Sequence, residues 1–239
     1  MTTLTTRVFP ARSALESALA ERLARAVAER PGPGGAVPAI MLSGGTTPLP
    51  AYQALGTRGR LERSARLQIL FSDDRYVPRD SPASNYHSAQ PLLAALALPE
   101  TAVLRVRTEL ALEEAALDYE RQLSALLASG ARIAPGLLGL GADGHTASLF
   151  GAADLERARG RLAIAVHRPD GLAAVSVTPA FLARVAEPVF VVAGPEKRSA
   201  VRALRAADPA LIAWRAVAGC EGVELWIDPA ASEVADART

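Results

Sequence analysis

The feature that most constrains the fold is a short apolar run that ends directly in a polar segment, and this pattern occurs three times. It spans residues 37–47, 67–75 and 137–145. Apolar runs of this length, separated by segments of helical character, indicate buried strands of a mostly parallel sheet with helices on both faces. Such sheets bind ligands beyond the carboxyl ends of their strands. We therefore expect a doubly wound α/β fold in which the three polar segments converge.

Capping residues and periodicity place the other elements. Ser13 and Glu16 form a capping-box pattern ahead of a helical apolar stripe, which the segment 31–35, rich in proline and glycine, brings to an end. Thr47 as cap and Pro48 in the first turn predict a second helix. Further helices are expected at 85–96 and 109–128 and from the pairs Thr178-Pro179 and Gly194-Pro195, and further strands at 162–166, 173–177, 189–193 and 223–227.

Composition excludes several classes of protein. The 26 basic residues nearly cancel the 25 acidic ones, so no global field favours nucleic acid or an anionic membrane. A single cysteine, Cys220, excludes an intramolecular disulfide framework and indicates an intracellular protein. The first residues lack the layout of a signal peptide and no apolar run approaches the ~18 residues that cross a bilayer, so we expect a cytoplasmic protein. Without repeats or long linkers, residues 1–239 are expected to form one domain.

The first polar segment has the composition of an anion-binding loop. It contains Ser43, Gly44, Gly45, Thr46 and Thr47. The two glycines have no side chain to shield their backbone N–H groups from an anion, the other three residues carry hydroxyl groups, and a helix N-terminus follows. The segment is neither a Walker loop nor a dinucleotide fingerprint, because it lacks the lysine of the first and the glycine spacing of the second. It is interpreted as a phosphate-binding loop, with a tight turn capped by threonine as the alternative.

The second polar segment supplies charge. Arg75 can pair bidentately with a phosphate, and Asp73 and Asp74 can hold the arginine or a sugar hydroxyl. The alternative is a solvated loop with a local salt bridge. Asn85, a short distance downstream, is interpreted first as a helix cap and second as a ligand-binding residue.

The third polar segment contains the most specific chemistry. His145 can act as general base or acid, and Asp143, two residues earlier on a glycine-rich turn, can orient it. A histidine that only caps a tight turn is the alternative. The other histidines, His87 and His167, are expected to be structural or at the surface.

Lys197 follows the Gly194-Pro195 helix start. A cation at that end of a helix opposes the helix dipole unless an anion is bound there too. Lys197 is therefore a second candidate for phosphate binding, and a solvated lysine is the alternative.

Five segments together resemble the bacterial 6-phosphogluconolactonases in order and spacing. They are Leu42 to Pro48 (LSGGTTP), Ser72 to Pro78 (SDDRYVP), Ser84 to Tyr86 (SNY), Leu140 to Phe150 (LGADGHTASLF) and Val191 to Lys197 (VVAGPEK). The resemblance spans nearly the whole chain. It implies the doubly wound fold of the sugar-phosphate isomerase and deaminase superfamily, with no redox cofactor and no required metal. It also implies that the substrate is a small phosphorylated sugar lactone of the oxidative pentose phosphate pathway. The protein is expected to be a monomer or a small homo-oligomer.

Two other functions are alternatives to the activity that this resemblance implies. Glucosamine-6-phosphate deaminases are similar in two of the segments but carry a catalytic glutamate five residues after the histidine, where this chain has Phe150. They have phenylalanine where Ser148 stands here. A non-catalytic sugar-phosphate sensor would usually carry a basic helix-turn-helix segment, which is not visible in the sequence. Both comparisons favour the lactonase.

The chain departs from the family pattern at two positions. Asp74 replaces a usual glutamate, which matters only if the middle carboxylate of that segment makes the contacts. Ala174 stands where the family usually has arginine, so the missing positive charge must come from elsewhere, with Arg168 as one candidate.

The motifs divide into an anion cradle and a base, as hydrolysis of a phosphorylated lactone requires. We expect the loop 43–47, Arg75 and Lys197 to hold the phosphate, with Asp73 and Asn85 also binding substrate. His145 would take a proton from the attacking water and then protonate the leaving ring oxygen, oriented by Asp143. Backbone N–H groups near Gly44 or Gly141 are the expected oxyanion donors. No serine or cysteine lies in a nucleophile elbow, which favours direct attack by water.

Overall fold

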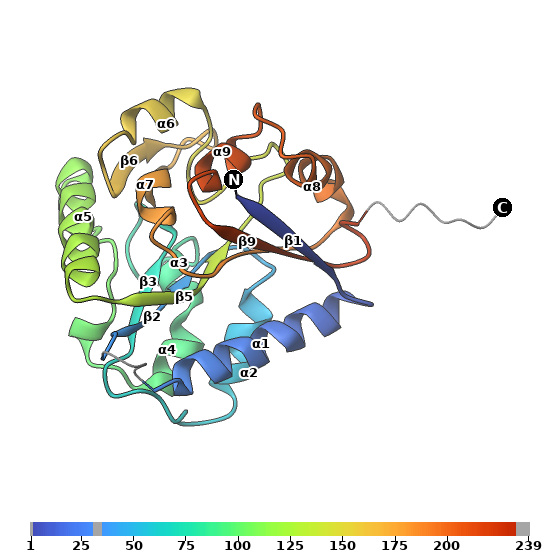
Figure 1. The fold of residues 1–239 in the computed structure, drawn as a ribbon. Helices are drawn as coiled ribbons and strands as arrows, with labels where there is room; N and C mark the ends of the chain where they lie inside the picture. The colour runs from blue at the N-terminus through green and yellow to red at the C-terminus, as the bar shows by residue number, and fades with distance from the viewer. Residues whose placement is uncertain (1, 31–34, 233–239) are drawn as a thin grey trace.

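The computed structural model describes residues 2–30 and 35–232, and a six-stranded sheet runs through its centre (Figure 1). All five strand pairings in this sheet are parallel. The strand order is β1-β9-β8-β5-β2-β3. The strands are β1 (Thr3–Val8), β2 (Pro38–Leu42), β3 (Gln68–Phe71), β5 (Arg132–Leu138), β8 (Pro188–Val192) and β9 (Gly222–Ile227). The mostly parallel α/β architecture expected from the apolar runs is confirmed.

A second, antiparallel sheet was not predicted. It consists of β4 (Asp73–Arg75), β7 (Ala173–Val177) and β6 (Ala163–His167), in the order β4-β7-β6. Ser72 joins the two sheets: its N–H donates to the carbonyl of Leu42 at 2.8 Å, and its own carbonyl accepts from Val177 at 2.9 Å. The alternative that residues 73–75 form a solvated loop is therefore wrong, because the chain passes directly from one sheet into the other.

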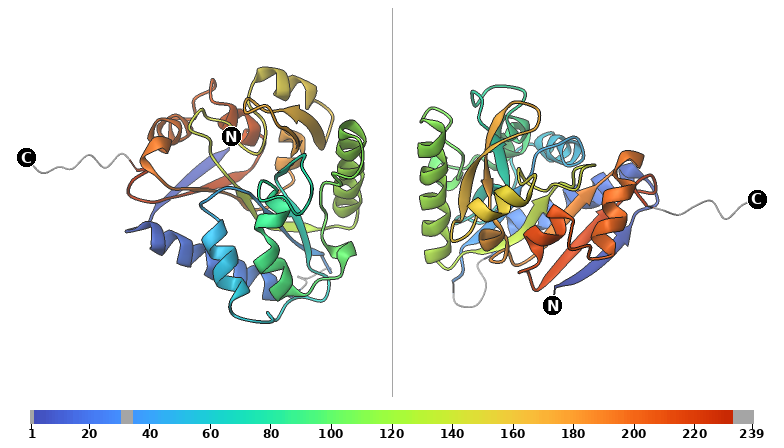
Figure 2. Two further views of the ribbon diagram at one scale, coloured as in Figure 1. Left: turned by 180° about the vertical axis from the view of Figure 1, so that it is seen from behind. Right: turned by 90° about the horizontal axis from the view of Figure 1, so that it is seen from above.

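Helices cover both faces of the parallel sheet, as the two further views in Figure 2 show. One hydrophobic cluster contains α1 (Arg12–Ala28), α2 (Leu49–Gly56) and α4 (Gln90–Leu96). The other contains α5 (Leu112–Ala128), α7 (Pro179–Leu182), α8 (Arg198–Arg205) and α9 (Ile212–Val217). The remaining short elements are α3 (Asn85–Ser88), η1 (Glu100–Ala102), α6 (Ala152–Arg157) and η2 (Pro195–Lys197).

The central strands bury side chains on both faces, which explains why they read as continuous apolar runs. In β2, Ala39 and Met41 belong to one cluster, whereas Ile40 and Leu42 belong to the other. Alternate residues of a strand point to opposite faces, so a strand between two helical layers must be apolar at every position.

Several predicted helix boundaries are wrong. α1 begins at Arg12 with Ala11 as its N-cap, so Ser13 lies inside the helix and Glu16 pairs with Arg12 instead of completing a capping box. Thr47 is not a cap either, because Pro48 holds the N-cap position of α2. The segment 31–34 expected to end the first helix lies outside the described residues.

Other boundaries differ in instructive ways. The helix expected over 85–96 is two helices that meet at Ala89, just before the proline at position 91. The helix expected from 109 begins at Leu112, and the helix expected from Gly194-Pro195 starts as a short 3-10 turn. The predicted start at Thr178 is confirmed, since its side chain accepts from the N–H of Phe181.

The order of the strands creates a crevice between β2 and β5. From β2 the chain moves to β3 at one edge, whereas from β5 it moves through β8 to β9 in the opposite direction. At such a switch in direction the connections leave the strand ends uncovered, and ligands of doubly wound folds bind there. The polar segments after β2 and β5 therefore flank one opening.

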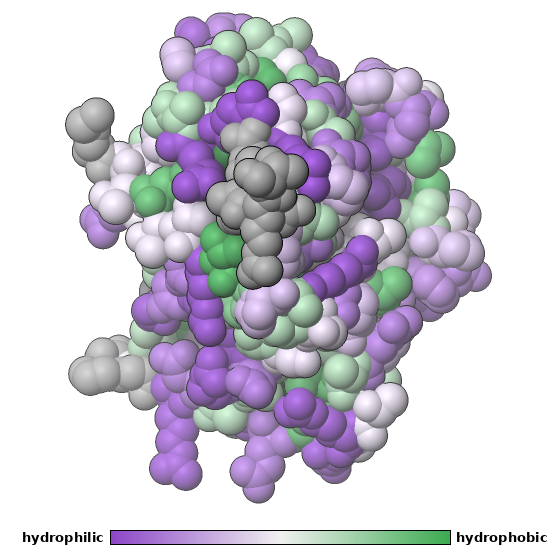
Figure 3. Space-filling model, turned by 90° about the vertical axis from the view of Figure 1, so that its right-hand side faces the viewer, coloured by the Kyte–Doolittle hydropathy of each residue, from purple (hydrophilic) through white to green (hydrophobic). Residues whose placement is uncertain are grey.

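The surface is mainly polar. Figure 3 shows one face on which apolar residues lie in small separate patches. The large apolar side chains that are exposed among the described residues are Val8, Leu117 and Leu172. No helix of the described chain is long and apolar enough to cross a membrane.

Candidate active site

A cavity of about 340 Å³ lies at the carboxyl ends of the strands, where the sequence places its polar segments. Of the predicted site residues, all except Asp143 line this cavity. They are Ser43, Gly44, Gly45, Thr46, Thr47, Asp73, Arg75, Asn85, His145 and Lys197. The cavity therefore brings together residues from segments that follow four different strands.

Asp143 lies behind His145. Its Oδ1 is 2.5 Å from Nδ1 of His145, and the backbone N–H of His145 donates to the same oxygen at 3.3 Å. Burial raises the pKa of Asp143, but the hydrogen bond and charge of His145 lower it by more, so the net pKa lies below its usual value. The carboxylate is thus ionised at neutral pH and fixes the ring so that Nε2 is the nitrogen left for chemistry.

The turn that carries this pair depends on glycine. A side chain at Gly141 would place its Cβ 2.1 Å from Nδ1 of His145 and 2.2 Å from Oδ1 of Asp143. Gly144 has φ +85°, which favours glycine. The N–H of Gly141 donates to the carbonyl of His145 at 2.8 Å, so it is not an oxyanion donor in this structure.

The loop 43–47 is held at its start, by Tyr52 at Ser43 and by the packing of Asn85 against Gly44. The hydroxyl of Tyr52, on α2, donates to the carbonyl of Ser43 at 2.9 Å and accepts from its N–H at 3.3 Å. A Cβ at Gly44 would lie 1.8 Å from Oδ1 of Asn85, so only glycine allows the loop and Asn85 to pack together. Sequence reasoning missed Tyr52, because nothing in its local pattern distinguishes it from a core residue.

Asp74 does not line the cavity; it holds the segment that carries Asn85. Its carboxylate accepts from the N–H of Asn85 at 2.6 Å, the N–H of Tyr86 at 3.2 Å and the hydroxyl of Ser84 at 3.1 Å. Burial raises the pKa of Asp74 to about 6, although these hydrogen bonds lower it in part. The middle carboxylate therefore has a positioning role, which its shorter side chain still fulfils.

Asn85 is not a helix cap. Ser84 takes that position in α3, since its Oγ accepts from the N–H of His87 at 3.2 Å. The side chain of Asn85 instead donates to the carbonyl of Asp73 at 2.8 Å. Its Oδ1 is therefore left at the wall of the cavity.

Unpaired polar atoms gather around the cavity. Among the described residues, the buried side-chain nitrogen and oxygen atoms without a hydrogen-bond partner are Ser43 Oγ, Arg75 Nε and Asn85 Oδ1. All three residues line the cavity. Unpaired buried polar atoms are rare in folded proteins, and their concentration at one cavity leaves hydrogen bonds there for water or a polar ligand to complete.

The positive charges in the cavity wall come from three different segments of the chain. Arg75 extends from β4 and donates from Nη1 to the carbonyl of Ala83 at 2.9 Å. Lys197 is the last residue of η2 and directly precedes α8. Arg168, at the start of the loop between β6 and β7, also lines the cavity, as does Glu196. That Arg168 replaces the charge missing at Ala174 stays a prediction.

The described residues contain no group of three or more histidine, cysteine, aspartate or glutamate side chains arranged to hold a metal ion. Asp73 instead pairs with hydroxyl groups: Ser72 donates to Oδ1 at 2.9 Å and Ser148 donates to Oδ2 at 2.6 Å. His145 in the cavity wall, with Asp143 behind it, is an arrangement suited to moving a proton.

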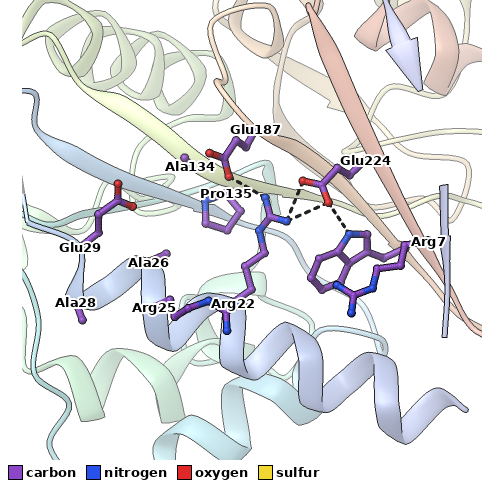
Figure 4. A pocket seen from close by; sticks show the side chains of 11 residues that line it. Arg7, Arg22, Arg25, Ala26, Ala28, Glu29, Ala134, Pro135, Glu187 and Glu224 are labelled. Atoms are coloured by element: carbon purple, nitrogen blue, oxygen red, sulfur yellow. Dashed lines mark hydrogen bonds and ion pairs between the residues drawn. The ribbon is translucent and has the colours of Figure 1, made fainter. Parts of the chain in front are cut away.

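Another cavity, of about 670 Å³, lies between α1 and the strands β1, β5 and β9 (Figure 4). It contains several arginines, but Arg22 binds Glu187 at 2.8 Å and Glu224 at 2.9 Å. The indole N–H of Trp226 donates to Glu224 at 2.7 Å. These contacts neutralise the guanidinium of Arg22 and connect α1 to the sheet, so we assign this cavity a structural role.

Comparison with known proteins adds an independent observation. The sequence profile described as glucosamine-6-phosphate isomerases/6-phosphogluconolactonase matches residues 10–226. The chain is 36% identical over 196 residues to the 6-phosphogluconolactonase of Synechocystis sp., across 79% of this chain and 78% of that protein. Its fold is similar to the crystal structure of the 6-phosphogluconolactonase from Thermotoga maritima, with a TM-score of 0.74 and 25% identity over 95% of this chain and 100% of that one.

The fold alone does not separate the two enzyme types of this profile. A monomeric glucosamine-6-phosphate deaminase also has a TM-score of 0.74, at 15% identity over 95% of this chain and 98% of that one. The distinction must therefore rest on side chains. At the position where the deaminase pattern has glutamate, this chain has Phe150 and therefore no carboxylate. The centroids of the Phe150 and His145 rings are 4.4 Å apart.

Proposed function

Because the chain belongs to the glucosamine-6-phosphate isomerase/6-phosphogluconolactonase family, we propose that it hydrolyses 6-phosphoglucono-1,5-lactone to 6-phosphogluconate by histidine-assisted attack of water. The chain is an enzyme that acts on a lactone, as its relatives named 6-phosphogluconolactonase indicate. The observation that carries the mechanism is the His145–Asp143 pair at the wall of a cavity whose other side chains are suited to an anion.

His145 acts as the general base. With Nδ1 held by Asp143, Nε2 takes a proton from a water molecule as the water attacks the lactone carbonyl. The same nitrogen then returns the proton to the ring oxygen, so that the C–O bond breaks and the free acid leaves. Asp143 stabilises the positive charge that the ring carries between these steps.

The phosphate binds away from the base. The backbone of the loop 43–47 supplies N–H groups next to the N-terminus of α2, and Arg75 and Lys197 supply charge. Asp73 and Asn85 face the sugar hydroxyls between the two ends. This arrangement supports a substrate with an anion at one end and a carbonyl at the other. Because Gly141 is already paired, we assign oxyanion stabilisation to the backbone around Gly44.

The test is acid release from freshly generated 6-phosphoglucono-1,5-lactone, measured above its spontaneous hydrolysis, with glucosamine 6-phosphate assayed in parallel. We expect acceleration of lactone hydrolysis and no ammonia from the amino sugar. His145→Ala is expected to lower turnover roughly a hundredfold or more. His87→Ala, outside the cavity, is the matched control. Ammonia release, or normal turnover in the His145 variant, would refute the mechanism.

A further inference from the structure

Arg168 is held in the cavity wall by the turn that connects β6 and β7. Its N–H donates to the carbonyl of Leu172 at 2.8 Å, and its own carbonyl accepts from Gly171 at 3.1 Å. The side chain is only 11% exposed, yet it lines the same cavity as His145. A nearly buried guanidinium in a cavity wall must find partners inside the protein or in a ligand.

Asp170 fixes one edge of this guanidinium. Nε of Arg168 lies 3.1 Å from both carboxylate oxygens of Asp170, and Nη2 lies 2.8 Å from Oδ2. Asp170 in turn accepts from the N–H of Leu172 at 3.2 Å. The side chain is therefore preorganised and does not have to be ordered when a ligand binds.

A second edge is fixed by a hydrogen-bonded chain that crosses the sheet. Nη1 of Arg168 donates to Oγ of Ser148 at 3.1 Å, and Ser148 donates to Asp73 at 2.6 Å. A guanidinium has five N–H donors. The bonds to Asp170 and Ser148 use three of them, which leaves one N–H on each terminal nitrogen for a ligand.

The neighbours of Arg168 set where that ligand group lies. Its guanidinium carbon is 5.2 Å from the centre of the Phe150 ring, and that centre is 4.4 Å from the centre of the His145 ring. Arg75 lines the same cavity, and the positive charges of Arg168 and Arg75 both lower the pKa of Asp170. Two guanidinium groups thus line one small cavity, and both can donate hydrogen bonds to a multiply charged anion bound there.

We propose that Arg168 is a substrate-binding residue that pairs with Arg75 to bind the phosphate, and that it determines the preference for a phosphorylated lactone. This inference rests on the proposed function. It adds a residue of the β6–β7 turn to the phosphate contacts of the loop 43–47, Arg75 and Lys197, with Asp170 as a positioning residue.

The variants are Arg168→Gln and Arg168→Lys, with Arg159→Gln as the control. Arg159 is 77% exposed and pairs with Glu156 outside the cavity, so its removal changes net charge equally. Binding of inorganic phosphate and of 6-phosphogluconate is measured by calorimetry, and kcat/KM by acid release. Thermal unfolding of each variant shows that it is folded.

We expect Arg168→Gln to lower the affinity for both ligands and to lower kcat/KM about tenfold to a hundredfold, through KM more than kcat. Arg159→Gln should change neither the affinities nor kcat/KM. Arg168→Lys should recover part of the phosphate binding, since it keeps the charge but loses the bidentate geometry. Unchanged phosphate binding with weakened 6-phosphogluconate binding would place Arg168 at the sugar and overturn the proposal, as would no change at all. Lack of lactone hydrolysis by the unmodified enzyme would instead refute the proposed function.

Discussion

Oδ1 of Asp143 lies 2.5 Å from Nδ1 of His145, and the two side chains meet in the space that the missing side chain of Gly141 leaves open. The pair is therefore local in sequence, but its geometry depends on one backbone position before it. A substitution at Gly141 can therefore displace the proposed base, His145, although neither His145 nor Asp143 is changed.

Gly141→Ala should inactivate the enzyme while leaving it folded. The added methyl group would lie 2.1 Å from the imidazole, so the ring must move, and a displacement of about 1 Å is expected to cost roughly a hundredfold in kcat. Gly151→Ala is the control, since a Cβ there meets nothing within 4 Å. Near-normal kcat in the Gly141 variant would show that the Asp143–His145 geometry is not needed.

Tyr52→Phe should destabilise the protein and weaken phosphate binding together. Removal of the hydroxyl leaves the N–H and carbonyl of Ser43 without this partner in a buried position, at a cost of about 1–3 kcal/mol in the free energy of unfolding. Urea denaturation measures the first effect and calorimetry with inorganic phosphate the second. Tyr119→Phe is the matched control: its hydroxyl makes the same two bonds to Phe71, outside the cavity lining, so it should lose stability but keep phosphate affinity.

Asp74 should make the free energy of unfolding depend on pH in an unusual direction. The folded protein binds the proton of this carboxyl more tightly than the unfolded chain, because burial raises its pKa from 3.8 to about 6. Between these pH values the folded state holds more protons, so the contribution of Asp74 to stability falls as pH rises and then stays constant above about pH 6. The total change is on the order of 3 kcal/mol.

Urea unfolding of the wild type and Asp74→Asn between pH 4 and 7 isolates this effect. The variant is expected to be less stable at every pH, because its amide cannot accept all the bonds from residues 84–86. The difference between the two proteins should shrink as pH rises. A difference that grows with pH would mean that the carboxylate is stabilised in the folded state.

Cys220 should be inert in the folded protein. It is 4% exposed, and burial raises the pKa of its thiol to about 11, so almost no thiolate exists at pH 8. Its Sγ also lies 3.3 Å from the carbonyl of Leu182. A thiol reagent should react within seconds in denaturant and only at the rate of unfolding without it. Rapid labelling of the native protein would contradict this.

Local patterns predicted much of the fold and the polar residues of the site. Buried strands such as β2 and β8 are visible because both of their faces contact helices and every position is apolar. β1 was not predicted: it is an edge strand, mostly exposed and rich in threonine, so it carries no such signal. The boundaries failed where proline or an unusual cap decided them, as at Ala89 and Ala11.

Sequence by itself determined which side chains follow each strand, and therefore that hydroxyls, charges and one histidine would lie at the carboxyl edge of a parallel sheet. Tertiary structure alone decided which of these residues line the cavity and which support it from outside. Asp74 lies outside the cavity lining and holds residues 84–86. Arg168 lines the cavity and is linked to Asp73 through Ser148, which lies 75 residues from Asp73 along the chain. The physical reason is that a short-range pattern fixes the direction of a side chain within its own strand, but strand order and the junction at Ser72 set which distant side chains meet.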